Sequence, residues 1–310
     1  MKPDWPGKTY RSLMLKPILV FGATGQVGRE IMRRSDKFPR PLIGLTRAEI
    51  DIRDNEAVSA TIARLSPGLV INCAAYTAVD KAETEQDIAF SVNRDAPAHL
   101  AKACFAQSIP LLHMSTDYVF DGRKPQPYLE NDRVAPLGIY GASKLAGEIA
   151  VREHLPSHVI LRTAWVFAAH GTNFVRTILR LSAERPALRI VADQHGGPTS
   201  AAAIADAMVA IALRIDTGRM AWGTYHFCGA PATTWFDFAA AILREAVKHG
   251  HRAVPIEPIT TADYPTPAAR PANSVLSCAR IKEALGIDQP DWRQDLAVVV
   301  ADLLSTHPTP

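Results

Sequence analysis

The chain has 310 residues, of which 47% are hydrophobic and 21% are charged. A chain of this length buries roughly 75% of the surface that it exposes when unfolded, so it can form a core without disulfides or metal ions. With 34 basic and 31 acidic side chains, the net charge of +3 gives no indication of a nucleic-acid partner. The longest apolar run, residues 201–213, contains Asp206 and is too short to cross a membrane. The four cysteines lack metal-ligand spacing and are expected to be reduced thiols of a cytoplasmic protein.

The first half of the chain alternates short apolar runs with segments of helical periodicity. Strands are expected at residues 18–21, 42–45, 69–71, 109–112 and 159–161. Helices are expected at residues 26–34, after Asp54 as an N-cap, at 96–105 and at 140–151. Strands that are apolar on both faces and alternate with helices predict a parallel sheet covered by helices on both sides. The sequence therefore predicts an α/β fold with a doubly wound parallel sheet.

The pattern changes after Thr163. Expected helices at residues 173–182, 201–213 and 236–247 are separated by short β-like pieces such as 225–227, and a Pro-rich segment covers 255–271. This predicts a smaller α+β lobe, with the Pro-rich segment lying across a cleft. We expect an N-terminal extension over residues 1–14, a first domain over 15–168 and a C-terminal lobe over 169–310. The boundary is soft, and segments can interleave across it.

A glycine-rich turn, Gly22-Ala23-Thr24-Gly25-Gln26-Val27-Gly28, follows the first predicted strand. Gly22 permits a tight exit from the strand, Gly25 lets backbone N–H groups approach a pyrophosphate, and Gly28 lets the helix pack closely. The helix N-terminus also offers unpaired donors to phosphate. An ordinary strand–helix turn is the alternative, and the position after the first strand of an alternating α/β pattern disfavours it.

Tyr140 and Lys144 lie four residues apart on one face of a predicted helix. A phenol with its ordinary pKa of about 10 is a weak acid–base group near neutral pH. A neighbouring cation is expected to lower that pKa, and the same ammonium can bind a nicotinamide ribose. The alternative is a surface Tyr–Lys pair without a role.

Polar residues end the fourth apolar run, at the carboxyl edge of the sheet where ligands bind in open α/β folds. Thr116 can form a hydrogen bond at a substrate oxygen beside Tyr140, and Asp117 follows it directly. The alternative is that Thr116 and Asp117 only cap the end of the strand.

Together these elements resemble the extended short-chain dehydrogenase/reductase superfamily, and within it the dTDP-4-dehydrorhamnose reductase family. The resemblance extends over nearly the whole chain after Met14. The stretches that carry it are residues 22–28, 72–83, 115–122, 140–144, 162–167, 193–199 and the Pro-rich 264–271. It implies a Rossmann fold with a smaller substrate lobe.

The resemblance also implies roles for individual residues. Tyr140 would donate the proton, Lys144 would bind ribose, and Thr116 would tune the tyrosine and contact the sugar. Asp117 and Trp165 would line the sugar–nucleotide site, although Trp165 could instead fill the core. The implied dinucleotide site comprises Gly22, Thr24, Gly25, Gln26, Val27, Gly28, Asp51, Ile52, Ala74, Ala75, Tyr76, Thr77, Tyr140 and Lys144.

The implied reaction is NADPH-dependent reduction of the C4 ketone of dTDP-4-dehydro-β-L-rhamnose to dTDP-L-rhamnose, in dTDP-rhamnose biosynthesis. A dTDP-sugar would be the small-molecule partner, and a homodimer is an option. Some members share a magnesium ion at a dimer contact, for which Glu30 could be one ligand. Because residues 201–203 are alanines and offer no second carboxylate, we expect no metal.

Three other functions remain open. A 4,6-dehydratase of the superfamily would resemble Ser-Thr-Asp-Glu where this chain has Tyr118 in place of the glutamate. A non-catalytic NAD(P)-binding regulatory subunit shares the fold, and an intact set of Thr116, Tyr140 and Lys144 argues against it. Reduction of another sugar nucleotide is the third option.

Arg47 ends the second predicted strand, and the next carboxylate along the chain is Glu49. An Asp or Glu near this position favours NAD, whereas an Arg accommodates the 2′-phosphate of NADPH. We therefore expect Arg47 to favour NADPH, with NADH as the less preferred cofactor. The alternative is that Arg47 is a solvated loop residue.

Overall fold

A sheet of six parallel strands forms the centre of the protein, whose computed structural model describes residues 15–305. The expected extension, residues 1–14, lies outside this described part. The strands of the sheet are β1 (Ile18–Phe21), β2 (Leu42–Leu45), β3 (Leu69–Asn72), β4 (Leu111–Thr116), β5 (His158–Thr163) and β10 (Gly223–His226). β4 is the strand that departs most from expectation, since it extends to Thr116.

The strand order is β10-β5-β4-β3-β1-β2, and every neighbouring pair is parallel. β1 therefore lies between β2 and β3, and the chain leaves β1 toward one edge and returns on its other side. Such a reversal opens a crevice at the carboxyl ends of the strands, where ligands bind in folds of this class. The glycine turn after β1 and residues 73–77 after β3 both lie at this reversal.

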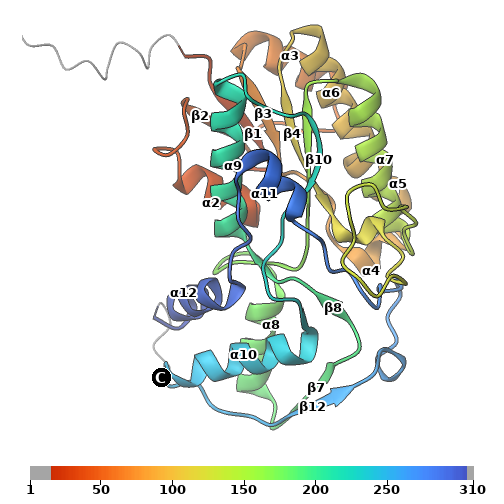
Figure 1. Cartoon of the computed structure of the whole chain (residues 1–310), viewed down its shortest axis with the longest axis vertical. Helices are drawn as coiled ribbons and strands as arrows, with labels where there is room; N and C mark the ends of the chain where they lie inside the picture. Colours follow the sequence, from red (N-terminus) through yellow and green to blue (C-terminus); the bar gives the residue numbers. More distant parts are fainter. Residues whose placement is uncertain (1–14, 306–310) are drawn as a thin grey trace, which may run out of the picture.

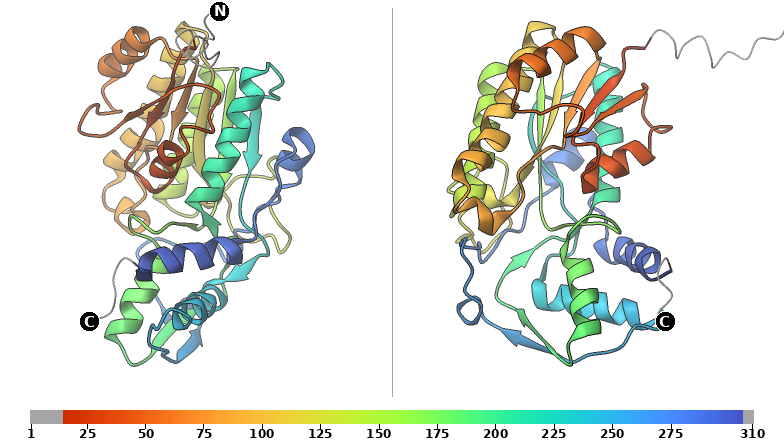
Figure 2. Two further views of the ribbon diagram at one scale, coloured as in Figure 1. Left: turned by 90° about the vertical axis from the view of Figure 1, so that its left-hand side faces the viewer. Right: turned by 180° about the vertical axis from the view of Figure 1, so that it is seen from behind.

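Helices cover both faces of the sheet (Figures 1 and 2). One face carries α2 (Gln26–Arg33) and α9 (Ala201–Asp216), and the other carries α3 (Asn55–Leu65), α6 (Ala96–Ala106) and α7 (Ile139–His154). Ile18 and Val20 of β1 belong to the core on the first face, and Leu19 and Phe21 belong to the core on the second. The predicted doubly wound α/β fold is confirmed.

The sequence predicts the start of α3 correctly. Asp54 caps α3 as expected, because its side chain accepts hydrogen bonds from the backbone N–H groups of Glu56 and Ala57. Two short helices, α4 (Val79–Ala82) and α5 (Gln86–Phe90), precede α6. No helix within residues 15–305 is long and apolar enough to span a membrane.

A smaller part of the protein lies below the sheet in Figure 1. Its elements are α8 (Phe174–Glu184), β7 (Leu188–Val191), β8 (His195–Gly196), β11 (Thr233–Thr234), α10 (Trp235–Val247), β12 (Ile256–Ile259) and α12 (Trp292–Ser305). It has its own core, in which Phe167, Phe238 and Trp292 are buried. β7 and β12 pair in parallel, so the Pro-rich segment begins beside β7.

The chain crosses between the two parts more than once. Residues 201–213 and 225–227 were expected in the smaller lobe, but α9 packs on the first face of the sheet and β10 is its edge strand. α11 (Ala279–Leu285) also joins that core through Ile281 and Leu285. α9 joins the large sheet because it buries its apolar face there, with Ile204, Met208 and Ile211 fully buried.

A buried ion pair ties α7 to the sheet. Arg162 of β5 donates to Glu148 of α7, from Nε to Oε1 at 2.8 Å and from Nη2 to Oε2 at 2.7 Å. The Ser115 hydroxyl of β4 donates to the same carboxylate at 2.6 Å. Burial opposes ionisation of Glu148, but the hydrogen bonds and charge of Arg162 outweigh it and lower the pKa of Glu148 below its usual value.

We predict that Arg162→Met destabilises the protein by about 3 kcal/mol, because it leaves a buried carboxylate without its main partner. The value lies at the lower end of the usual range since Arg152 still contacts Glu148 at 3.2 Å. Urea denaturation of the variant measures the loss. The double variant Arg162→Met/Glu148→Leu is the control, and it should be more stable than Arg162→Met alone. Equal stability of Arg162→Met and the unaltered protein would contradict this account.

Candidate active site

Two adjoining cavities lie at the carboxyl edge of the sheet. The first, of about 420 Å³, is bounded by the glycine turn, the end of β2 and the loop after β3. The second, of about 600 Å³, continues from the same turn toward the smaller lobe. Thr24 and Gly25 line both cavities, so the glycine turn joins them.

The glycine turn requires its three glycines for different reasons. Gly22 has φ +79°, a left-handed conformation that favours glycine. A Cβ at Gly28 would overlap the carbonyl oxygen of Gly22, so this glycine permits the close approach of α2. A Cβ at Gly25 would meet only Gly22 O at 3.3 Å and would otherwise extend into the hollow. The turn therefore presents bare backbone and the N-terminus of α2 to the cavities, which suits a pyrophosphate.

Thr116, Tyr140 and Lys144 meet in the second cavity. β4 ends at Thr116, and α7 begins one residue before Tyr140. Lys144 is 3% exposed, and its Nζ donates to the backbone oxygen of Met114 at 2.7 Å. The expected association of the threonine, the tyrosine and the lysine is therefore present in the fold.

The expected lowering of the Tyr140 pKa by Lys144 is wrong for this structure. Burial raises the pKa of Tyr140 to about 12, a hydrogen bond with Thr116 acts against this rise, and the charge of Asp117 adds to it. Burial also lowers the pKa of Lys144 to about 8, although Glu148 favours its charged form. Lys144, whose ammonium binds the Met114 carbonyl, is not among the groups that shift the pKa of Tyr140, so the expected effect of the cation is absent here.

Asp117 lies beneath the same cavity and is 1% exposed. The Thr116 hydroxyl donates to its Oδ1 at 3.0 Å. Burial raises the pKa of Asp117 to about 6, while hydrogen bonds from Ser274 and Thr116 favour its ionised form. Thr163 Oγ1, on the same cavity wall, is buried and finds no hydrogen-bond partner among residues 15–305. These polar groups fit a hydroxyl-bearing ligand such as a sugar.

Trp165 lines the second cavity and also packs against the cores of both parts of the protein. It has φ +46°, an uncommon conformation for a bulky residue and one that is typical of functional sites. Its ring stacks on Trp235 with centroids 3.4 Å apart and planes 6° from parallel. Gly196 packs against it, because a Cβ there would overlap the Trp165 ring. The pair forms an aromatic wall between the two parts of the protein.

A third cavity, of about 410 Å³, lies between α8, β7 and the Pro-rich segment. Tyr118 and Trp235 line both this cavity and the second one, so the two adjoin. Arg185, Arg189 and Arg270 provide positive charge around it. The prediction that the Pro-rich segment lies across a cleft agrees with this geometry.

The mouth of the first cavity carries the charges that bear on cofactor preference. Arg47 is exposed and lines this mouth together with Arg53. The Glu49 carboxylate accepts hydrogen bonds from the backbone N–H and hydroxyl of Thr46, both at 2.8 Å, so it belongs to the turn. The side-chain hydrogen bonds of Arg53 lower the pKa of Asp51 to about 2.

The structure brings together all of the predicted site residues except Gly28, which lines neither cavity and packs against the turn instead. Those at the first cavity are Gly22, Thr24, Gly25, Arg47, Asp51, Ile52, Ala74, Ala75 and Tyr76. Those at the second are Thr24, Gly25, Gln26, Val27, Ala75, Thr77, Thr116, Asp117, Tyr140, Lys144 and Trp165. The bare turn and the two joined hollows fit an extended dinucleotide with its reactive end beside Tyr140.

Sequence reasoning missed Trp235, Thr163 and Glu85. Trp235 comes from the smaller lobe, and no local pattern indicates that its ring reaches Trp165. Glu85 lines the first cavity and accepts a hydrogen bond from the Tyr76 hydroxyl at 2.7 Å. Thr163 could have been found, because it follows the predicted strand 159–161 closely, as Thr116 follows the predicted strand 109–112.

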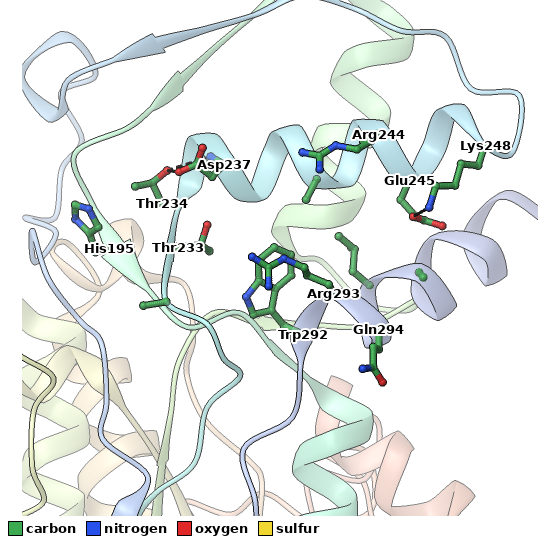
Figure 3. A pocket seen from close by; sticks show the side chains of 14 residues that line it. His195, Thr233, Thr234, Asp237, Arg244, Glu245, Lys248, Trp292, Arg293 and Gln294 are labelled. Atoms are coloured by element: carbon green, nitrogen blue, oxygen red, sulfur yellow. Dashed lines mark hydrogen bonds and ion pairs between the residues drawn. The ribbon is translucent and has the colours of Figure 1, made fainter.

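Two further features lie away from this site. Glu30 pairs with Arg33 at 3.0 Å and with Arg34 at 2.6 Å, and within residues 15–305 no group of three His, Cys, Asp or Glu side chains could hold a metal ion. A hollow of about 720 Å³ lies between α10 and α12 (Figure 3). Several of its charged and polar side chains satisfy one another, as Thr234 does with Asp237 and Glu245 does with Lys248.

Comparison with known proteins gives consistent results. A family model described as RmlD substrate binding domain matches residues 16–305. The dTDP-4-dehydrorhamnose reductase of Burkholderia thailandensis is 46% identical over 301 residues, covering 93% of this chain and 99% of that protein. The protein of the same name from Aggregatibacter actinomycetemcomitans is 44% identical over 283 residues, covering 90% and 96%.

Solved structures agree with this. A dTDP-4-dehydrorhamnose reductase from Clostridium acetobutylicum has a TM-score of 0.87 at 37% identity, covering 93% of this chain and 99% of that one. The enzyme of the same name from Bacillus anthracis, in complex with NADP, has a TM-score of 0.83 at 32% identity, covering 92% and 99%. The chain therefore belongs to the family of the RmlD substrate binding domain and of the dTDP-4-dehydrorhamnose reductases.

Proposed function

We propose that this chain reduces the C4 ketone of dTDP-4-dehydro-β-L-rhamnose with NADPH and releases dTDP-L-rhamnose. The observation that carries the proposal is the meeting of Thr116, Tyr140 and Lys144 in one cavity with the glycine turn. That cavity can hold a ketone beside a proton donor and beside the end of a dinucleotide. When bound, the nicotinamide cofactor supplies the hydride.

Tyr140 donates the proton to the oxygen that becomes the C4 hydroxyl. With a pKa of about 12 the phenol is fully protonated at neutral pH. An alkoxide is a much stronger base, since even water has a pKa of about 15.7. Proton transfer to the new alkoxide is therefore downhill, and reduction does not require the lowered tyrosine pKa that the sequence suggested. The Thr116 hydroxyl donates its proton to Asp117, so a lone pair of Thr116 Oγ1 can accept a hydrogen bond from the new C4 hydroxyl.

Lys144 binds the ribose hydroxyls next to the nicotinamide. Its pKa of about 8 lies above neutral pH, so the side chain remains mainly charged there. Deprotonation as the pH rises through about 8 removes the charge and with it part of the ribose interaction.

The third cavity holds the nucleotide part of the substrate. Arg185 and Arg189 lie exposed at its rim, and Arg270 is half-buried there with both Nη atoms donating to Asp80. Guanidinium groups bind phosphate oxygens by paired hydrogen bonds. Because the third cavity adjoins the second, a sugar linked to this diphosphate can reach Tyr140.

The rival functions are less well supported. A dehydratase needs a carboxylic acid at position 118, where this chain has a half-buried tyrosine whose ring lies edge-on to that of Tyr140, with ring centroids 5.5 Å apart. A purely regulatory subunit does not need Thr116, Tyr140 and Lys144 to meet in one cavity. A cytoplasmic location and a homodimer remain predictions.

The direct test of the proposed function is turnover. The purified chain is mixed with NADPH and dTDP-4-dehydro-β-L-rhamnose, and the product is identified by mass spectrometry. We expect NADPH to be consumed in step with formation of dTDP-L-rhamnose. Binding of NADPH without turnover would favour the regulatory alternative.

We predict that Tyr140→Phe folds and binds NADPH but loses at least ~10²-fold in turnover, because the ring remains and the proton donor is removed. Steady-state kinetics measure the loss, and titration with NADPH is the control for binding. Turnover near that of the unaltered protein would mean that another group donates the proton.

Arg47 at the mouth of the first cavity, with Glu49 engaged in its own turn and Asp51 paired with Arg53, supports a preference for NADPH over NADH. We predict that Arg47→Ala raises the KM for NADPH roughly ten-fold and leaves the KM for NADH nearly unchanged, because only the former has a 2′-phosphate. Arg64→Ala, an exposed change of the same charge on α3, is the control. Equal effects of Arg47→Ala on both cofactors would remove this role.

A further inference from the structure

The four-residue helix α4 lies where the sheet, α7 and the smaller lobe meet (Figure 1). Val79 lines the second cavity, and Asp80 lines the third. Ala82 is fully buried and anchors the segment. The two carboxylates of this segment, Asp80 and Glu83, both contact elements that carry residues of the proposed active site.

Glu83 caps the catalytic helix from a distance in sequence. Its Oε1 accepts a hydrogen bond from the backbone N–H of Ile139, the first residue of α7, at 2.9 Å. The N-cap residue itself is Gly138, which has no side chain with which to satisfy the free N–H groups of the first turn. A carboxylate at this end is also favoured by the helix dipole.

Gly138 leaves room for this contact. A Cβ at that position would lie 2.6 Å from Glu83 Oε1, closer than the two atoms can approach. The glycine and the glutamate therefore form one arrangement. Tyr140 follows Ile139 directly, so the carboxylate fixes the backbone turn from which the proton donor extends.

Asp80 holds the opposite side of the site. Its carboxylate accepts two hydrogen bonds from Arg270, from Nη1 at 2.6 Å and from Nη2 at 2.9 Å, and one from the backbone N–H of Ala268 at 3.2 Å. Arg270 and Ala268 belong to the strap, which we define as residues 264–271. The strap borders the third cavity through Tyr264, Thr266 and Arg270.

We propose that Glu83 and Asp80 are positioning residues. Through them residues 79–83, which we call the bracket, connect the proton donor to the substrate lobe. Glu83 sets the first turn of α7, and Asp80 sets the strap. Neither contacts the reacting atoms. The inference rests on the proposed function, since it assigns Glu83 to placement of the proton donor and Asp80 to binding of the substrate.

The bracket predicts a different kinetic defect for each carboxylate. Glu83→Ala should lower kcat about ten-fold with little change in the KM for dTDP-4-dehydro-β-L-rhamnose, because it misplaces Tyr140 only. Asp80→Asn should raise that KM about ten-fold with little change in kcat, because it frees the strap. Glu83→Gln keeps an acceptor oxygen and should restore most of kcat.

Two measurements support the comparison. Amide hydrogen exchange over residues 139–142 should be faster in Glu83→Ala than in the unaltered protein, and this readout needs no substrate. Asp87→Asn, an exposed acid in the neighbouring α5, is the matched control and should change neither kinetics nor exchange. Gly138→Ala, which displaces the carboxylate without deleting it, should reproduce the kcat loss and replaces Glu83→Ala if that variant does not fold.

The outcomes separate the inference from the proposed function. If the unaltered chain does not turn over the keto sugar nucleotide, the proposed function fails. If it does turn over the substrate and Glu83→Ala changes neither kcat nor exchange at residues 139–142, the bracket is wrong. A similar fall in kcat together with a similar rise in KM in both Glu83→Ala and Asp80→Asn would also contradict it, because this pattern would indicate general destabilisation.

Discussion

The docking of α7 on the sheet through buried charged groups is the constraint on which the site depends. Lys144 and Glu148 are four residues apart and face the same strands, where they bind the Met114 carbonyl and Arg162. A buried charge is costly without its partner, so each contact permits few alternative positions of the helix. Tyr140 lies one turn before Lys144, and its place beside Thr116 follows from that fixed register.

The interleaved path of the chain explains how one active site draws on both parts of the protein. Along the chain, α9, β10 and α11 follow α8 and β7 and return to the large sheet. The smaller part is therefore connected to the sheet by several crossings of the chain rather than by one linker. Stacking of Trp165 on Trp235 and pairing of Asp80 with Arg270 close the remaining sides. The three adjoining cavities thereby form one continuous cleft.

Much of this architecture is encoded locally and could be predicted. β1 lies where its apolar run predicts it, and Asp54 caps α3. The glycine turn, Thr116 and Tyr140 lie together because each follows the carboxyl end of a strand, and these ends share one edge of a parallel sheet. The membership of α9 and β10 in the large sheet could not be predicted, because hydrophobic periodicity identifies an element without naming its neighbour. Contacts such as Asp80 with Arg270 span 190 residues and leave no local signal. The shift in the Tyr140 pKa depends on burial, which appears only once the cavity is formed.

The central claim is that Tyr140 and Thr116 together receive the oxygen at C4 of the sugar. A crystal structure of the unaltered chain with NADP⁺ and dTDP-L-rhamnose tests this most directly. The account predicts the C4 hydroxyl within hydrogen-bond distance, about 2.6–3.2 Å, of both Tyr140 Oη and Thr116 Oγ1. It also predicts the diphosphate beside Arg270. A sugar bound with its C4 hydroxyl directed away from Tyr140, toward the solvent or toward Trp235, would contradict it.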